Sequence, residues 1–118
     1  MSDLEETLAF HMRINNIPEP MRQYRFHPKR KWQADFAWED DQLIVEVEGG
    51  LWMQTGTGRG KGHAHPKRFI DDCEKYNEAT LLGWRVIRVT EPQINDGSAI
   101  QWIKRALTKE GSFDPPPF

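Results

Sequence analysis

Residues 31–48 carry the pattern of a β-hairpin. Between 31 and 38, apolar side chains alternate with polar ones, as in a strand with one buried face. The residues expected on that buried face are Trp32, Ala34, Phe36 and Trp38. An acidic turn, Glu39-Asp40-Asp41, then leads into a second strand at 43–48. The pattern therefore predicts two neighbouring antiparallel strands in the first half of the chain.

Three helices and two further strands are expected around this hairpin. The helices are predicted at 3–15, 67–82 and 98–109, and the added strands at 22–27 and 84–89. Ser2 with Glu5, and Ser98 with Gln101, have the spacing of capping boxes. The residues expected on the buried sides of the helices are Leu4, Leu8, Met12, Phe69, Cys73, Tyr76, Leu81, Ile100, Ile103 and Leu107. The order α-β-β-β-α-β-α predicts an α/β fold, a mixed β-sheet flanked by helices.

Length and composition favour one soluble domain. The chain has 118 residues, 37% hydrophobic and 29% charged, which suits a single core over residues 1–110. The Pro-rich tail at 111–118 is expected to be extended or disordered. No apolar run approaches the about 20 residues that span a bilayer, and the acidic start differs from a secretory signal. We therefore expect a cytoplasmic protein without a membrane partner, and the single cysteine, Cys73, excludes an intrachain disulfide.

The basic residues are concentrated in two windows, although the net charge is −2. Nine of the sixteen Lys and Arg residues fall within 22–31 and 59–68, which contain no acid. Acids cluster chiefly at 35–48 and 71–78. Basic segments flanking an acidic centre are typical of a protein that binds phosphates around a metal ion. Two solvated loops would give the same pattern, so charge alone leaves both interpretations open.

Three acidic residues of the hairpin are candidate metal ligands. Strand alternation puts Glu46 and Glu48 on the same face of 43–48, and Asp35 on the neighbouring strand can face the same way. Converging carboxylates repel each other, and a hard cation such as Mg²⁺ or Mn²⁺ relieves the repulsion while keeping positions open for water and phosphate. The alternative is that Glu46 and Glu48 form the solvent face of a half-exposed strand.

Three segments of the chain carry a family pattern in a fixed order and spacing. They are Ala34-Asp35-Phe36, then Ile44-Val45-Glu46-Val47-Glu48-Gly49-Gly50 with Trp52, then Asp72-Cys73-Glu74-Lys75-Tyr76-Asn77 leading to Leu82-Gly83-Trp84-Arg85-Val86-Ile87-Arg88. With these segments, about half of the chain resembles the PD-(D/E)XK nuclease superfamily. The resemblance is greatest to the branch of the very-short-patch repair endonucleases and related small single-domain proteins of phages and bacteria. It implies a restriction-endonuclease-like fold.

The resemblance also implies roles for individual residues. Asp35 would be the bridging metal ligand, Glu46 the second carboxylate, and the carbonyl of Val47 a backbone ligand. Ala34 stands where the motif's name expects proline, which is a tolerated change.

The position of Glu48 departs from the family pattern, because the superfamily usually has there a lysine that orients or activates water. An acid at this position implies a general base or a ligand that acts through water. Lys75, on the helix that follows, is the candidate for the missing positive charge. The alternative for Lys75 is an ion pair with Asp71 or Asp72 across one helix turn.

Residues 49–65 are expected to form a long basic loop, which holds six of the nine glycines. Two roles are open for His63 and His65: acid–base catalysis near a phosphate, or a plain phosphate or loop contact. Trp52 either stacks on a base or seals the end of the sheet. Gly58-Arg59-Gly60-Lys61 lacks the rest of a phosphate-loop motif, so we expect a flexible cationic flap over the DNA backbone. The residues expected to bind DNA are Arg25, Lys29, Arg30, Lys31, Trp52, Arg59, Lys61, Lys67 and Arg68.

Together these patterns predict a Mg²⁺-dependent endonuclease that hydrolyses phosphodiester bonds in DNA, for repair, recombination or processing in phage or bacterial cells. Its catalytic residues are expected among Asp35, Glu46, Glu48, His63, His65 and Lys75. One alternative is a nucleic-acid-binding module of the same fold without catalysis, which the missing lysine favours. Another is a nuclease directed at branched junctions or RNA. The patterns leave open whether the protein acts as a monomer or a homodimer.

Overall fold

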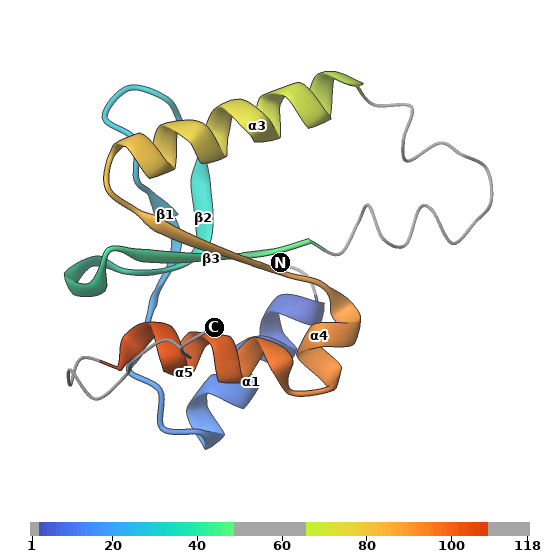
Figure 1. Cartoon of the computed structure of the whole chain (residues 1–118). Coiled ribbons are helices and arrows are strands. Elements are labelled where there is room, and N and C mark those ends of the chain that lie inside the picture. Colours follow the sequence, from blue (N-terminus) through green and yellow to red (C-terminus); the bar gives the residue numbers. More distant parts are fainter. Residues whose placement is uncertain (1–2, 49–65, 109–118) are drawn as a thin grey trace, which may run out of the picture.

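Four strands form one mixed sheet in the order β1-β2-β3-β4 (Figure 1). The computed structural model describes residues 3–48 and 66–108. The strands are β1 Met21–Arg25, β2 Gln33–Trp38, β3 Leu43–Val47 and β4 Arg85–Val89. The helices are α1 Asp3–Ile14, η1 Glu39–Asp41 (a single 3₁₀ turn), α3 Pro66–Leu81, α4 Glu91–Asn95 and α5 Ser98–Leu107. The prediction of a mixed sheet flanked by helices is confirmed.

The predicted hairpin is present as β2 and β3, which pair antiparallel. Its acidic turn forms η1, and the turn closes at Gln42, whose φ of 52° lies in the left-handed region. β1 adds antiparallel to β2. β4 adds parallel to β3, which needs the crossover connection through α3. The parallel register places Glu46 beside Arg88.

Helices cover both faces of the sheet. In Figure 1, α3 lies above the sheet, and α1, α4 and α5 lie below it. The larger core is on the lower face, where α1 and α5 bury Leu8, Met12, Ile100 and Ile103 against the strands. Among the described residues, no helix is long and apolar enough to cross a membrane.

The side chains of β2 do not all follow the predicted alternation. Phe36 and Trp38 belong to the lower core, whereas Ala34 packs on the α3 face of the sheet, with Trp32 against the same cluster. The expectation that these four share one face is therefore wrong. The change of face occurs across Asp35, opposite Gln23 of β1, whose φ of 49° departs from extended backbone while the register is the same on both sides.

The prediction for the buried side of α3 is also wrong in part. Ala79 is fully buried, but Phe69 and Leu81 are 69% and 80% exposed and Cys73 is exposed as well. The side that faces the sheet carries Ala79 together with polar side chains, Asp72, Lys75 and Tyr76. The apolar spacing predicted the wrong side of α3, because the side that faces the sheet contacts charged groups of β3 and β4 and is therefore polar.

The C-terminal part contains a helix that the sequence did not suggest. Thr90-Glu91-Pro92 begins α4 rather than only ending a strand, and the Gln93 side chain accepts a hydrogen bond from the Thr90 N–H at 3.0 Å. The predicted capping box at Ser98 is absent. Gly97, with a φ of 91°, precedes α5, and the Ser98 N–H and hydroxyl both donate to Asp96 instead. Ser2, of the first predicted capping box, lies outside the described residues.

The unequal burial of two phenylalanines gives a stability test. Phe36→Ala is expected to lower the free energy of unfolding by about 3–5 kcal/mol, because Phe36 is fully buried in the lower core. Phe69→Ala should change it by less than about 0.5 kcal/mol, because that side chain is largely exposed. Urea denaturation measures both values. Equal losses of stability in the two variants would contradict the exposed position of Phe69 on α3.

Candidate active site

The hairpin strands separate at Asp35. The last ladder pair between β2 and β3 is Phe36 with Val45. Beyond it the Val47 N–H donates to Oδ2 of Asp35 at 2.8 Å, where a backbone carbonyl would otherwise accept. This bond ties the Asp35 carboxylate to β3, close enough to Glu46 for its charge to raise the pKa of that residue.

Glu46 is a buried carboxylate with one unsatisfied oxygen. The residue is 6% exposed, and alternation along β3 directs its side chain toward α3. Oε1 accepts a hydrogen bond from Nζ of Lys75 at 3.2 Å. Oε2 is buried without a hydrogen-bond partner in the described part of the chain. Such an oxygen is costly to leave without a donor or a cation, so it marks a place for a missing partner.

The surroundings of Glu46 disfavour its charged form. Burial raises its pKa from 4.5 to about 7, an effect that the nearby Lys75 ammonium reduces and the charges of Asp35 and Glu48 increase. Near neutral pH the carboxyl therefore exists in both its protonated and its ionised form. A bound cation would shift that balance toward the carboxylate.

Lys75 reaches the carboxylates from α3. Its Nζ donates to the carbonyl of Gln33 at 2.9 Å as well as to Glu46, and its side chain is 13% exposed. The alternative ion pair of Lys75 with Asp71 or Asp72 is absent among the described residues, where Lys75 pairs with Glu46 of β3. Asp71 pairs instead with Lys67, at 3.1 Å. A positive charge therefore lies beside the carboxylate pair even though position 48 holds an acid.

Glu48 lies on the same face of the sheet but in a different set of contacts. Its N–H donates to the Val89 carbonyl at 2.7 Å, which extends the pairing with β4. Its Oε2 accepts hydrogen bonds from the Tyr76 hydroxyl and from Nε of Arg88, both at 3.0 Å. Burial raises the pKa of the Tyr76 hydroxyl, and the charges of Glu46 and Glu48 add to the effect, so the phenol remains a donor.

Two residues of this region, and one of the helix that covers the other face of the sheet, were not assigned from the sequence. Tyr76 was treated only as a core residue, and Arg88 was not assigned because its place beside Glu46 depends on the parallel register. Glu5 of α1 is 5% exposed and accepts a hydrogen bond from the Gln23 amide at 2.8 Å. The sequence held a signal for Glu5, which precedes Leu8, Ala9 and Met12 at the spacing of the buried helix face.

The predicted DNA-binding residues fall into two groups. Those in the described part are basic and exposed: Arg25, Lys29, Arg30, Lys31, Lys67 and Arg68. Arg30 stacks over the Trp32 ring at 3.9 Å and pairs with Glu74 at 3.4 Å, so it also holds the β1–β2 loop against α3. The others lie outside the described residues, as do the two candidate catalytic histidines: Trp52, Arg59, Lys61, His63 and His65.

The carboxylate pair fits a magnesium ion in its donor chemistry. Among residues 3–48 and 66–108, no group of three or more His, Cys, Asp or Glu residues could hold a metal. Magnesium, however, is usually bound through one or two carboxylates, with water and substrate phosphates as the other ligands. Asp35 and Glu46 supply two carboxylates, and the unsatisfied Oε2 of Glu46 is a ligand atom without another partner. The third predicted ligand, Glu48, already accepts two hydrogen bonds.

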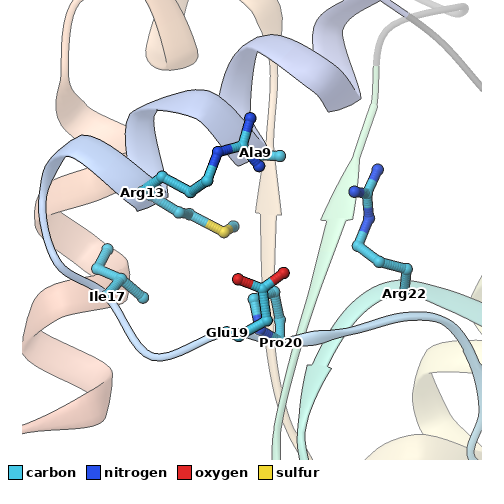
Figure 2. A pocket seen from close by; sticks show the side chains of 7 residues that line it. Ala9, Arg13, Ile17, Glu19, Pro20 and Arg22 are labelled. Carbon is cyan, nitrogen blue, oxygen red and sulfur yellow. The ribbon is translucent and has the colours of Figure 1, made fainter.

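A separate hollow on the molecule does not include these residues. Figure 2 shows it between α1 and the segment that enters β1, with Arg13, Glu19 and Arg22 around it. Arg22 is itself paired with Glu6 at 2.8 Å and lies over the Phe36 ring. The hollow is small and its charged residues are of both signs, so the carboxylate pair remains the better candidate site.

Comparisons with protein-family models, curated proteins and solved structures gave no significant match. The functional assignment therefore depends on the chemistry of the site: the buried Glu46 carboxyl beside the half-buried Asp35, the Lys75 ammonium on Oε1 of Glu46, and Oε2 of Glu46, which has no hydrogen-bond partner among the described residues.

The raised pKa of Glu46 predicts a pH-dependent stability. In the unfolded chain Glu46 ionises near pH 4.5, whereas in the folded protein it stays protonated to about pH 7. The folded state therefore binds more protons in this window, and the contribution of Glu46 to stability falls as pH rises from 4.5 to about 7. Above pH 7 this shift in pKa corresponds to a loss of about 3 kcal/mol in the free energy of unfolding.

Glu46→Gln should remove this loss and stabilise the protein more at pH 8 than at pH 5. The increase in the free energy of unfolding will be less than about 3 kcal/mol, because Lys75 loses its anionic partner. Denaturant unfolding at the two pH values, without divalent metal, measures the difference. An equal effect of the substitution at both pH values would contradict the buried, protonated state of Glu46.

Proposed function

We propose that this protein is a Mg²⁺-dependent endonuclease that hydrolyses phosphodiester bonds in DNA. The observation that carries the proposal is the unsatisfied, buried Oε2 of Glu46, next to Asp35 and to the Lys75 ammonium. Within the described part of the chain this second oxygen has no donor, and it matches the need of a hard cation for oxygen ligands. The resemblance to the PD-(D/E)XK nucleases assigns the same two carboxylates to the metal.

Asp35 and Glu46 would hold the ion, with the Val47 carbonyl as a backbone ligand. The bound ion would supply activation of a water molecule and neutralisation of charge at the phosphate. The Val47 N–H fixes one oxygen of Asp35, so that carboxylate is oriented before any ligand arrives. Mn²⁺ is expected to substitute, because it accepts the same oxygen ligands.

Lys75 would take the role of the lysine that is missing at position 48. Its ammonium is held by the Gln33 carbonyl and Glu46, next to the carboxylate pair and on the same face of the sheet. In hydrolysis a water oxygen forms a bond to phosphorus and one P–O ester bond breaks. A fixed cation at this point would stabilise the negative charge that grows on the phosphate oxygens. The basic residues of the β1–β2 loop and of the start of α3 would bind neighbouring phosphates.

Supercoiled plasmid tests this assignment. We expect nicking that requires Mg²⁺ or Mn²⁺ and stops with EDTA. Asp35→Ala should abolish it, because this removes a ligand while the buried apolar core stays intact. Lys75→Met should lower the rate by about 10²-fold or more, the usual loss when one charge-stabilising donor is removed. Arg13→Gln is the matched control, because Arg13 is exposed on α1, on the opposite face of the sheet.

The alternatives predict other outcomes of the same assay. Metal-dependent cleavage of branched DNA or RNA, without plasmid nicking, would keep the chemistry and change the substrate. DNA binding without cleavage in either metal would support a binding module and overturn the enzyme. Cleavage that persists in Asp35→Ala would place the reaction at a different site.

A further inference from the structure

Arg88 of β4 has no role in the proposed metal site, although it lies beside it. The parallel register pairs it with Glu46, and its contacts with Glu48 and Tyr76 place its side chain on the α3 face. That face also carries Lys75. The backbone of a second cationic residue therefore lies one strand spacing from that of Glu46.

The Arg88 side chain is held at one edge. Its Nε donates to Oε2 of Glu48 at 3.0 Å, and its guanidinium lies over the Tyr76 ring, 4.3 Å from the centroid. The Tyr76 hydroxyl donates to the same Glu48 oxygen. Glu48, Tyr76 and Arg88 thus all contact one another, which fixes the plane of the guanidinium without using its two terminal nitrogens.

The outer edge of that guanidinium is available to a ligand. Its side chain is 47% exposed, and its two terminal nitrogens make no hydrogen bond within the part of the chain that the structure describes. Arg85 of the same strand is the contrast, because its Nη2 donates to the carbonyls of Asp41 and Ala106, both at 3.0 Å. Arg85 is used in the structure of the protein, whereas Arg88 keeps the donors that bind phosphate in pairs.

We propose that Arg88 binds a phosphate oxygen of the DNA at the metal site, and that Glu48 and Tyr76 are positioning residues for its guanidinium. This assignment rests on the proposed function, because it gives the phosphate a second cationic contact beside the ion. It also gives Glu48 a role that differs from a metal ligand. Its carboxylate orients Arg88 instead of replacing the missing lysine.

The charges around Arg88 make this contact dependent on the metal. Glu48 accepts its hydrogen bond, and Asp72 lies near enough to raise its pKa together with Glu48. Among the described residues, Lys75 and Arg88 are surrounded by four acids, Asp35, Glu46, Glu48 and Asp72. An anionic phosphate is therefore repelled until a divalent cation is bound.

DNA binding as a function of salt tests the role of Arg88 without requiring cleavage. The full chain is titrated onto a labelled DNA duplex with Ca²⁺, and the affinity is followed between about 50 and 200 mM salt. Arg88→Gln should weaken binding and make the slope of log affinity against log salt shallower by about 0.9, the value for one phosphate contact. Arg88→Lys should keep the wild-type slope. Arg13→Gln should match wild type in both quantities.

Glu48→Gln separates positioning from metal ligation. It should weaken DNA binding, because Arg88 is less well fixed, while the affinity for Ca²⁺ in the absence of DNA stays that of wild type. A loss of Ca²⁺ affinity in Glu48→Gln would make Glu48 a ligand and overturn its positioning role. The Ca²⁺ titration of the protein alone supplies this readout, and it does not depend on activity.

The outcomes distinguish this inference from the proposed function. If wild-type protein binds DNA in a metal-dependent way and Arg88→Gln has the wild-type slope, the role of Arg88 is wrong and the nuclease assignment stands. If wild-type protein binds no DNA with any divalent metal, both are overturned. A shallower slope in Arg88→Gln but not in Arg13→Gln supports the phosphate contact.

Discussion

The buried contact between Glu46 and Lys75 is the constraint on which the rest of the site depends. It joins β3 to α3 across the upper face of the sheet, with a carboxylate that is largely removed from water. Burial of this kind is costly, and the lysine offsets the cost only in part, since the pKa of Glu46 remains raised. The fold keeps an acid at a position where burial disfavours its charged form. A buried carboxyl whose pKa is shifted in this way is typical of a functional site.

The geometry of β3 extends this contact into two neighbouring charge clusters. Alternation along the strand puts Glu46 and Glu48 on one face, and the helix that crosses that face supplies Lys75 to the first and Tyr76 to the second. Two adjacent residues of α3 thus reach two acids that are separated by one residue on the strand. In the proposed function the first cluster serves the metal, and in the further inference the second serves the phosphate through Arg88.

Local patterns were sufficient to predict the strands and the hairpin, and the interpretation of Asp35 with Glu46 needed only strand adjacency. Local patterns could not predict how the strands pair in register or which side of each strand and helix is buried. The change of face at Asp35 lies opposite Gln23 of β1, whose backbone is left-handed, and no local pattern marks either feature. Arg88 reaches the site only because β4 pairs parallel with β3. The side of α3 that faces the sheet is largely polar because it meets charged groups, so the apolar spacing of the helix coincides with exposed residues such as Phe69.

The central claim is that Glu46 gives its unsatisfied oxygen to a divalent cation. Calorimetric titration of Mg²⁺ into the protein at pH 6, in buffers of different ionisation enthalpy, tests it most directly. A carboxyl with a pKa of about 7 is mostly protonated there, so binding should release about one proton per ion. Glu46→Gln should release none and bind Mg²⁺ far more weakly. Binding without proton release, or equal binding by wild type and Glu46→Gln, would contradict the account.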